Sequence, residues 1–512
     1  MTKPPKTGAD QPSRRAFLRS VALATAAAPA ACTTESGPLH EVQPVCAVVG
    51  LGAKITHGPL SGGATDISVE FTARLDKAGK VQFSLQSAAG GSPILTPCTI
   101  AAAENDFSVH LAATGLVPAT RYVATPLIDE IADSSHNIET TTFPAAGTLA
   151  AHSFCFGSCQ RHGDGAKGES LGKTFEVAAN WPDRPLFFAQ IGDWTYPDYL
   201  FGKMGHDKDG KNYTAFPEEI RKSYLRRMDP TYPMRKLVGK LPLAHVWDDH
   251  DFAENNAHRD VTGKQSDRVS AFARYLPTYP LPISQLGVWQ QFSAGHVDYW
   301  LVDMRSQRTD FAKAIVPGKD KDGKDILVLK EPPAHTMLGA EQLDWLVGGL
   351  KASKALWKIV FFPVEINPRY DVVLEQGLEL QSQIFAQAAG DGWCGYPTER
   401  KKILDLHTSG AVKNMLFLTG DAHQSSMKER DAACPPVFMA ANLDIDQAPI
   451  MDLLAAIDIV PESIWPYWTQ GGTGTNTIGR VRIVTSPKHQ VICEAWDQNG
   501  SLLKSMTIDA EI

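Results

Sequence analysis

The sequence predicts a layered α/β fold preceded by a small all-β sandwich, and two patterns predict it. From about residue 150 onward, short apolar strands alternate with helix-like stretches, whereas residues 40–145 form short runs of alternating polar and apolar side chains separated by Gly, Asp and Pro. The first pattern is typical of a sheet covered by helices on both faces, and the second of strands that bury one face. A chain of 512 residues is also long enough for one large domain and a smaller companion.

Residues 1–31 predict an export signal. A twin-arginine pattern, Ser13-Arg14-Arg15-Ala16-Phe17-Leu18-Arg19, precedes an apolar, Ala-rich run from Val21 to Ala31. The run is too short to span a bilayer, and its position after the arginines is that of a cleavable signal. We therefore expect export by the twin-arginine machinery to the periplasm or the cell exterior. Cys32, after Pro29-Ala30-Ala31, leaves lipid anchoring to a membrane open as an alternative to plain cleavage after an alanine.

Composition argues against two other classes of protein. The chain has a formal net charge of −8, and because residues 1–31 hold five basic residues and one acid, the remainder carries −12. Such a chain has no basic excess with which to neutralise phosphates, so a nucleic-acid-binding surface is not expected. Eight cysteines occur without a Cys-x-x-Cys pair, which excludes a zinc ribbon. Export permits disulfides; Cys46 and Cys98 are one candidate pair, and the sequence leaves the pairing open.

The all-β region is expected to be a sandwich of short strands that ends at the turn Pro144-Ala145-Ala146-Gly147. Two sequence segments, residues 58–65 and 115–122, are similar to segments of fibronectin-type-III-like domains. The expected strands are 67–75, 81–85, 107–111 and 120–125.

In the α/β region each expected strand ends in a polar cluster. Helices are expected between the strands, at 217–228 and 339–350. Ligands of open α/β sheets bind where strands end, so these clusters are where a functional site is expected. The strands and the acids that follow them are 186–191 before Asp193, 244–247 before Asp248, 300–302 before Asp303 and 416–418 before Asp421.

Acidic side chains crowd two of these strand ends. Asp193 is followed three residues later by Tyr196, and a carboxylate and a phenolate together can bind one hard trivalent cation. The run Asp248-Asp249-His250-Asp251 places three acids and an imidazole within four residues. Adjacent like charges repel unless a cation offsets them. The alternatives are an ordinary Gly-Asp turn and a solvated acidic loop.

Two weaker motifs add other ligand types. Asp421 and His423, two residues apart after another strand, can point toward one site from an extended loop, although a capping Asp and a surface His would look the same. Cys159 ends a strand, and its thiolate could bind iron or zinc. The alternative for a cysteine is a small buried hydrophobe, which we assign to Cys155.

Four motifs in chain order resemble those of the PhoD-like alkaline phosphatase D family, a branch of the metallophosphoesterases. They are Gly-Ser-Cys-Gln at 157–160, Gly-Asp-x-x-Tyr at 192–196, Asp-Asp-His-Asp at 248–251 and Gly-Asp-x-His at 420–423. The resemblance covers about residues 45–430 and implies a four-layer αββα sandwich. It also implies an exported, metal-dependent phosphoesterase that hydrolyses phosphate mono- or diesters, or both, by attack of a metal-bound hydroxide. A phospholipase D-like phosphodiesterase on the same site, and an exported binding module without catalysis, stay open as alternatives.

The resemblance further implies a role for each matching residue, with Fe³⁺ and Ca²⁺ as the expected metals and other divalent ions as substitutes. The expected metal ligands are Cys159, Tyr196 and Asp421 for iron, Asp249 and His423 for the divalent ion, and Asp193 as the bridge between them. The expected catalytic residues are His250, which would assist the leaving oxygen, and Asn256 and Arg305, which would contact phosphate or support the ligands.

The predicted domains are an export signal (1–31), a PhoD-like N-terminal β-sandwich (40–145), the PhoD-like metallophosphatase domain (150–490) and a C-terminal strand (491–512). Two departures from the family concern the substrate pocket: residues 362–366 stand where the family often carries Gly-Asn-Gln, and Cys394 replaces a usual Asp. The segment 444–477 is expected to be either an active-site cover or a packed surface loop.

Overall fold

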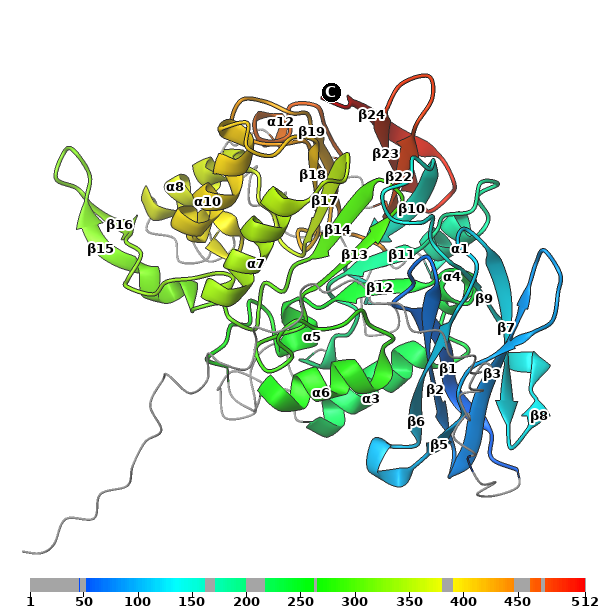
Figure 1. Cartoon of the computed structure of the whole chain (residues 1–512). Helices are drawn as coiled ribbons and strands as arrows, with labels where there is room; N and C mark the ends of the chain where they lie inside the picture. The colour runs from blue at the N-terminus through cyan, green and yellow to red at the C-terminus, as the bar shows by residue number, and fades with distance from the viewer. Residues whose placement is uncertain are drawn as a thin grey trace, which may run out of the picture. The chain divides into compact units, whose positions relative to one another are not determined.

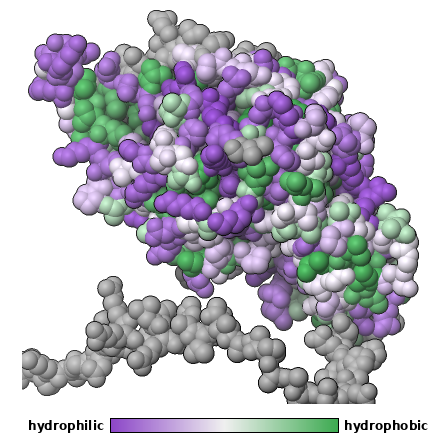
Figure 2. Space-filling model, turned by 45° about the horizontal axis from the view of Figure 1, so that its top comes forward, coloured by the Kyte–Doolittle hydropathy of each residue, from purple (hydrophilic) through white to green (hydrophobic). Residues whose placement is uncertain are grey.

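The computed structural model describes residues 46, 52–161, 171–198, 217–261, 265–379, 390–445, 461–470 and 475–511. The predicted export signal, with Cys32, lies outside the described residues. Among the described helices, none is long and apolar enough to cross a bilayer. On the face that Figure 2 shows, apolar side chains form separate patches among polar ones.

Two large mixed sheets face each other (Figure 1). In the first sheet β10, β11 and β12 run parallel, and in the second β14, β17, β18 and β20 do. Aromatic rings fill the space between them: the ring centroid of Phe154 lies 5.4 Å from that of Tyr299 and 5.9 Å from that of Phe361.

The described strands of the first sheet are, in spatial order, β24 (Leu502–Asp509), β23 (Gln490–Asp497), β22 (Thr477–Val484), β10 (His152–Gly157), β11 (Phe188–Ile191), β12 (Leu243–Val246), β1 (Ile55–Gly62), β2 (Ser68–Leu75) and β6 (Ser108–Thr114). Those of the second are β13 (Gln290–Ala294), β14 (Val297–Leu301), β17 (Trp357–Phe362), β18 (Met415–Thr419), β20 (Val437–Ala440), β19 (Ser425–Lys428) and β21 (Trp468–Thr469).

Helices cover the outer faces of the sheets (Figure 1), which gives the αββα order. Along β17, Ile359 and Phe361 belong to the core between the sheets, whereas Val360 and Phe362 pack in a second core with Leu346 of α7. Because both faces of this strand are buried, it is a continuous apolar run in the sequence.

The described α-helices are α1 (Lys173–Ala179), α3 (Pro217–Met228), α4 (Arg235–Val238), α5 (Asp249–Phe252), α6 (Gln265–Tyr275), α7 (Gly339–Ala352), α8 (Asp371–Glu379), α10 (Pro397–Thr408) and α12 (Pro461–Ile464). A hairpin of β15 (Ile315–Lys319) and β16 (Asp325–Leu329) extends from the second core (Figure 1).

The helices expected from the sequence are present, whereas the C-terminal expectation needs a correction. Helix α3 has the expected bounds, and α7 continues two residues beyond the expected end. The single strand expected over 491–512 is instead the antiparallel pair β23 and β24. The chain reverses at Asn499-Gly500, where φ of Gly500 is 81°, and Asn-Gly is a strong hairpin signal that a single long strand could not accommodate.

The all-β region belongs to two sheets. Strands β1, β2 and β6 extend the first large sheet, because β1 pairs in parallel with β12 at Gly62 and Leu243. A Cβ at Gly62 would lie 2.5 Å from the Leu243 carbonyl oxygen, so this approach requires glycine. A smaller sheet packs on these strands through the stacked rings of Phe71 and Phe83, 4.7 Å apart. Its described strands are β4 (Ile94–Leu95), β3 (Gly79–Ser87), β5 (Thr99–Ala101), β7 (Arg121–Ile128), β8 (Ile131–Ala132) and β9 (Ile138–Thr141). The division into domains near residue 145 stays a prediction, since one sheet runs across it.

Asp106 ties the all-β region to two helices of the α/β region. Its carboxylate accepts hydrogen bonds from Arg74 of β2 at 3.1 and 3.0 Å, from Arg221 of α3 at 2.7 and 2.9 Å, and from the Tyr275 hydroxyl of α6 at 3.0 Å. Burial alone would raise the pKa of Asp106, but the two guanidinium groups lower it well below its ordinary value.

The Asp106→Asn variant is expected to be less stable than the wild type by about 2 kcal/mol near neutral pH, because charge-assisted hydrogen bonds lose their charge. The folded pKa lies below the unfolded value of about 3.9, so the wild-type advantage is present above that pH and is lost as the pH falls below it. Urea unfolding near pH 7 and near pH 3 measures the difference. Asp344→Asn, at an exposed position of α7, is the control, and a pH-independent difference would contradict this ionic account.

Candidate metal centre

Strand ends from both large sheets meet at one place. Cys159 follows β10, Asp193 follows β11 and Asp249 follows β12, whereas Asp421 follows β18 of the facing sheet. The Cys159 thiol donates to the Asp421 carbonyl oxygen at 3.7 Å, and the Asp421 N–H donates to the Ser158 hydroxyl at 3.2 Å. Residues more than 250 positions apart in the chain therefore share one site.

Among the described residues, side-chain atoms that could bind a metal fall into three overlapping groups, and within each group they lie within 4.8 Å of one another. The groups are Cys159, Asp193 and His423; Asp193, Asp249 and His250; and Asp248, Asp249 and Asp421. Asp193 and Asp249 each belong to two groups, so the three form one continuous cluster. The sequence predicts Asp421 as an iron ligand together with Cys159, and His423 as a ligand of the divalent ion together with Asp249. In the structure His423 instead groups with Cys159, and Asp421 groups with Asp249.

The backbone turns sharply at several cluster residues. The angle φ is 61° at Cys159, 55° at Asp193, 68° at Asp421 and 49° at His423, and Asn256 has a φ of 59°. A left-handed conformation costs about 1–3 kcal/mol at a residue other than glycine. These turns end the pleat of each strand and aim the side chains at the neighbouring strand ends. Strain is therefore concentrated where the metal-binding atoms converge, as is typical of functional sites.

Burial and like charges act together on the cluster. Burial, with additional repulsion from neighbouring aspartates, raises the pKa of Asp193 and of Asp421 well above their ordinary values, and burial with the same two carboxylates raises the pKa of the Cys159 thiol. The Asp193 Oδ1 atom is buried and has no hydrogen-bond partner among the described residues. Such an arrangement of acids is stabilised by positive charge, so the donor set fits multivalent cations.

Tyr196 is hydrogen-bonded to Asp193, which belongs to two of the three groups. It is fully buried, and its hydroxyl donates to Asp193 Oδ2 at 2.7 Å. Burial, and then the charges of Asp193 and Cys159, raise the pKa of Tyr196 well above its ordinary value. A phenolate would therefore form here only where a strong Lewis acid takes the place of the proton.

His250 is oriented by an aspartate that sequence reasoning missed. Its Nδ1 lies 2.7 Å from Asp198 Oδ2, and both side chains are buried. Burial alone would lower the pKa of His250, but Asp198, Asp249 and Asp193 raise it well above its ordinary value. Asp198 follows Asp193 by five residues in the sequence, and this short spacing is the signal that could have identified it.

Asp251, in α5 after β12, is hydrogen-bonded to the segment that follows β11. It accepts hydrogen bonds from the backbone N–H groups of Trp194 at 3.2 Å and Thr195 at 2.6 Å. It also forms a capping box with Asp248 at the start of α5, which satisfies N–H groups that a helix otherwise leaves unpaired. Asp251 therefore fixes the separation between Asp193 and the residues of α5.

The Arg305 side chain is 0% exposed and contacts several buried aspartates. Its Nε donates to Asp248, its two terminal nitrogens donate to Asp391 at 2.9 Å each, and one of them lies 3.9 Å from Asp249. Arg308 donates to Asp391 at 2.5 Å. Of the two roles expected for Arg305, the geometry fits support of the acids; Asp391, which holds it, was not predicted as a site residue.

Asn256 contacts the cluster through its backbone, since its N–H donates to Asp249 Oδ2 at 2.6 Å. The departures from the family pattern lie beside the cluster. Glu365 accepts a hydrogen bond from the Thr419 hydroxyl at 3.2 Å, and burial raises its pKa to about 7. Cys394 is buried. Glu365 thus supports the end of β18, immediately before Asp421.

Part of the segment 444–477 is packed against the protein body. Trp465 is buried, Trp468 pairs with Met427 through β21 and β19, and the Tyr467 hydroxyl donates to the Ser505 carbonyl oxygen at 2.7 Å. Residues 446–460 and 471–474 lie outside the described residues, so an active-site cover formed by them stays a prediction.

Comparisons with known proteins identify related sequences and folds. Residues 154–442 match the PhoD-like phosphatase family. Alkaline phosphatase D of Bacillus subtilis (strain 168) is 25% identical over 398 residues, which cover 72% of this chain and 59% of that relative, so the chain spans about three-fifths of its length. The solved structure of PhoD has a TM-score of 0.64 at 18% identity, covering 89% of this chain and 92% of that one. Purple acid phosphatase PPD1 from yellow lupin (Lupinus luteus) seeds has a TM-score of 0.55 at 11% identity, covering 88% and 74%. Both structures share the fold, so the expected αββα architecture is confirmed.

Proposed function

Because the chain belongs to the PhoD-like phosphatase family, we propose that it is a hydrolase that cleaves phosphate esters, with bound cations, at the cluster between Cys159 and His423. One observation carries the proposal: strand ends far apart in sequence bring a thiol, imidazoles and aspartates into three overlapping groups. In the reaction a water oxygen bonds to phosphorus, the ester P–O bond breaks, and the leaving oxygen takes a proton. No phosphorylated enzyme would be required, because cations bound at this cluster would lower the pKa of the attacking water and so ease the loss of its proton.

The donor set supports one iron and one calcium site. Thiolate, phenolate and imidazole suit a ferric ion, and carboxylates alone suit a hard divalent ion such as Ca²⁺. The proposed iron ligands are Cys159, Tyr196 and His423; the proposed calcium ligands are Asp249 and Asp421, with Asp248 nearby; and Asp193, with its unpartnered Oδ1, would join the two. When bound, the cations would neutralise charge on the phosphoryl oxygens and lower the pKa of a bound water.

Residues of the chain itself are proposed to position the ester and move its proton. Asp198 engages Nδ1 of His250 at 2.7 Å, which orients the ring, and His250 is proposed to donate a proton to the leaving oxygen. Arg305 would hold the aspartates in place. The half-buried side chain of Asn256, beside Asp249, would contact phosphate.

Turnover of three ester classes by the metal-loaded protein tests this function. An aryl phosphomonoester, a bis-aryl phosphodiester and phosphatidylcholine would be compared at equal enzyme concentration. Hydrolysis of either aryl ester supports the proposal, and a strong preference for phosphatidylcholine would favour the phospholipase D-like alternative. Failure to hydrolyse any ester with metals fully bound would overturn the enzymatic proposal in favour of a binding module.

The Tyr196→Phe variant tests the identity of the metal. A phenolate bound to ferric iron gives a visible charge-transfer band, so the metal-loaded wild type is expected to be coloured and Tyr196→Phe colourless. The substitution leaves the ring in its buried site and removes only the hydroxyl that contacts Asp193. Visible spectra with metal analysis provide the measurement. A fully active, colourless wild type without iron would refute the iron assignment.

We also infer export through the twin-arginine machinery. The twin-arginine pattern at residues 13–19 supports it, and so does the disulfide between Cys46 and Cys98, a bond that persists in oxidising compartments. Fusing residues 1–45 to a reporter would test the inference. Export that is lost when Arg14 and Arg15 are replaced by lysine is the expected result; a reporter that stays in the cytoplasm with both arginines intact would overturn it. Mass spectrometry of the exported product would separate lipidation at Cys32 from plain cleavage.

A further inference from the structure

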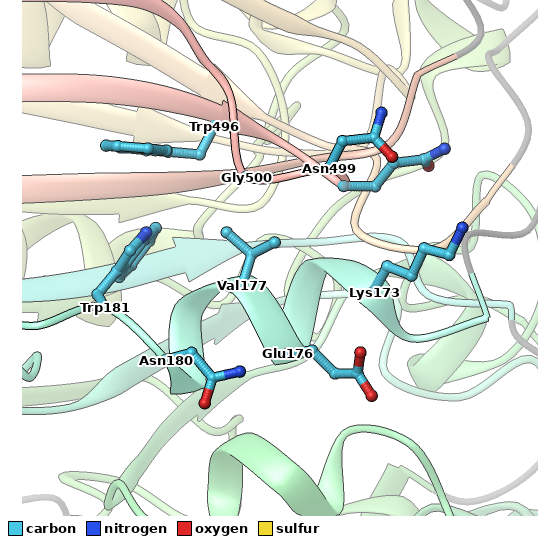
Figure 3. Close-up of a pocket in the computed structure, with 9 residues that line it drawn as sticks. Lys173, Glu176, Val177, Asn180, Trp181, Trp496, Asn499 and Gly500 are labelled. Atoms are coloured by element: carbon cyan, nitrogen blue, oxygen red, sulfur yellow. The ribbon is translucent and has the colours of Figure 1, made fainter.

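We propose that the pocket between α1 and the turn joining β23 to β24 binds a neutral sugar ring (Figure 3). Its volume is about 450 Å³, within the range of about 300–1,000 Å³ found for small-molecule sites. None of its lining residues belongs to the metal cluster. The proposal therefore does not rest on the hydrolytic function, and its test is independent of catalysis.

Two indole rings form the apolar wall of the pocket. Trp181 and Trp496 have ring centroids 5.8 Å apart and planes inclined by 58°, so no flat ring can insert between them. Figure 3 shows Val177 of α1 beside the two rings. A half-buried indole next to an aliphatic side chain suits the C–H face of a pyranose, which is apolar but not aromatic.

The aromatic wall is fixed from behind by a buried carboxylate. Glu494 accepts a hydrogen bond from the Trp496 indole N–H at 3.1 Å and forms an ion pair with Arg480 at 3.6 Å. The Arg480 guanidinium lies 4.9 Å from the ring centroid of Trp181 and also pairs with Asp183. Both indoles are thus oriented before a ligand arrives, which lowers the entropy lost on binding.

Neutral amides form the polar rim. Asn180, Gln498 and Asn499 are among the residues that line the pocket, and the Asn180 amide makes no side-chain hydrogen bond among the described residues. Gln498 uses its carbonyl oxygen to accept the Asn476 N–H at 3.3 Å, which leaves its NH₂ group to donate. Amide groups can both donate hydrogen bonds to hydroxyls and accept them. The hydroxyl groups along the edge of a sugar ring could therefore bond to these amides.

Charge on the rim does not favour an anion. The lining residues include one basic and one acidic side chain, Lys173 and Glu176, and Glu176 also pairs with Lys236 outside the pocket lining. Gly500 lies on the opposite wall, and its φ of 81° favours glycine. A Cβ there would stand 3.9 Å from Val177 Cγ2, so the walls approach closely at this end, and the sugar is proposed to lie against the indole rings instead.

Saturation-transfer NMR with methyl β-D-glucopyranoside and N-acetylglucosamine tests the proposal on the full-length protein, with and without a metal chelator. Transfer to the ring C–H protons of at least one sugar is expected under both conditions. Trp496→Ala is expected to weaken binding about tenfold and Asn180→Ala about threefold, whereas Trp496→Phe keeps most of it. Trp345→Ala, which truncates a half-buried tryptophan on α7, is the matched control and should bind like the wild type.

The proposal is overturned if neither sugar receives saturation, or if Trp496→Ala and Trp345→Ala bind alike. Benzoate and inorganic phosphate serve as competing probes: saturation of benzoate without sugar binding would indicate an aromatic ligand, and displacement of sugar by low phosphate would indicate an anion site. Either result contradicts the proposal. If Trp496→Ala does not fold, as judged by circular dichroism, Asn180→Ala decides, because the exposed Asn180 lies just after the last residue of α1.

Discussion

Replacing Asp193 by asparagine is expected to lower phosphoesterase turnover by a factor of about 10³ and to reduce metal content. Asp193 belongs to two of the three ligand groups, so its carboxylate is placed to join two cations. Asparagine has nearly the same volume and tolerates the left-handed backbone at this position. The variant therefore removes charge with little other change. Steady-state kinetics on an aryl phosphate, together with elemental analysis, provide the measurement.

The matched control for this variant is Asp405→Asn. Asp405 lies on α10, where it pairs with Lys401 at 2.6 Å while about half exposed, and its replacement should leave turnover unchanged. Asp193→Asn should also stabilise the metal-free protein, since it removes one of several repelling acids. Full turnover and full metal content in Asp193→Asn would exclude this carboxylate from the proposed centre.

The Arg305→Gln variant is expected to lose about 3–5 kcal/mol of unfolding free energy in the metal-free protein. Arg305 is 0% exposed and contacts Asp248 and Asp391 directly, so its loss leaves buried carboxylates with fewer positive partners. Bound cations near Asp249 would supply part of the missing positive charge. The loss of unfolding free energy should therefore be smaller when metal is present. Urea unfolding with a chelator and with added metal measures both values.

Arg369→Gln is the matched control for this prediction. Arg369 is 45% exposed and pairs with Asp431 at 3.7 Å, a surface geometry that contributes no more than about 1 kcal/mol. A double-mutant cycle with Asp391→Asn then isolates the buried pair. Coupling near zero between Arg305 and Asp391 would contradict the view that Asp391 holds the guanidinium beneath the metal ligands.

The strand ends of the site could be predicted because each apolar run stops in the sequence where its strand ends. A buried parallel strand is apolar on both faces, so Gly192-Asp193 after β11 and Gly420-Asp421 after β18 mark the points where the apolar runs stop. Parallel neighbours in one sheet end at the same edge. That rule alone brings Asp193 and Asp249 together from sequence.

The partners of these residues were harder to predict. Asp391 reaches Arg305 across 86 positions, and no periodicity relates a loop before α10 to a loop after β14. The grouping of His423 with Cys159 and of Asp421 with Asp249 was also not predicted, and both residues have left-handed φ values that residue type does not indicate.

The single parallel contact at Gly62 joins the all-β region to the αββα fold. A protein that began near residue 150 would lack β1, so the edge of β12 at Leu243 would lose its strand partner. An unpaired, apolar edge strand is a template for association with other chains. Truncation at the apparent boundary should therefore yield aggregates instead of a smaller enzyme, and insertions or fusions are better tolerated at the hairpin between β15 and β16 than at that junction.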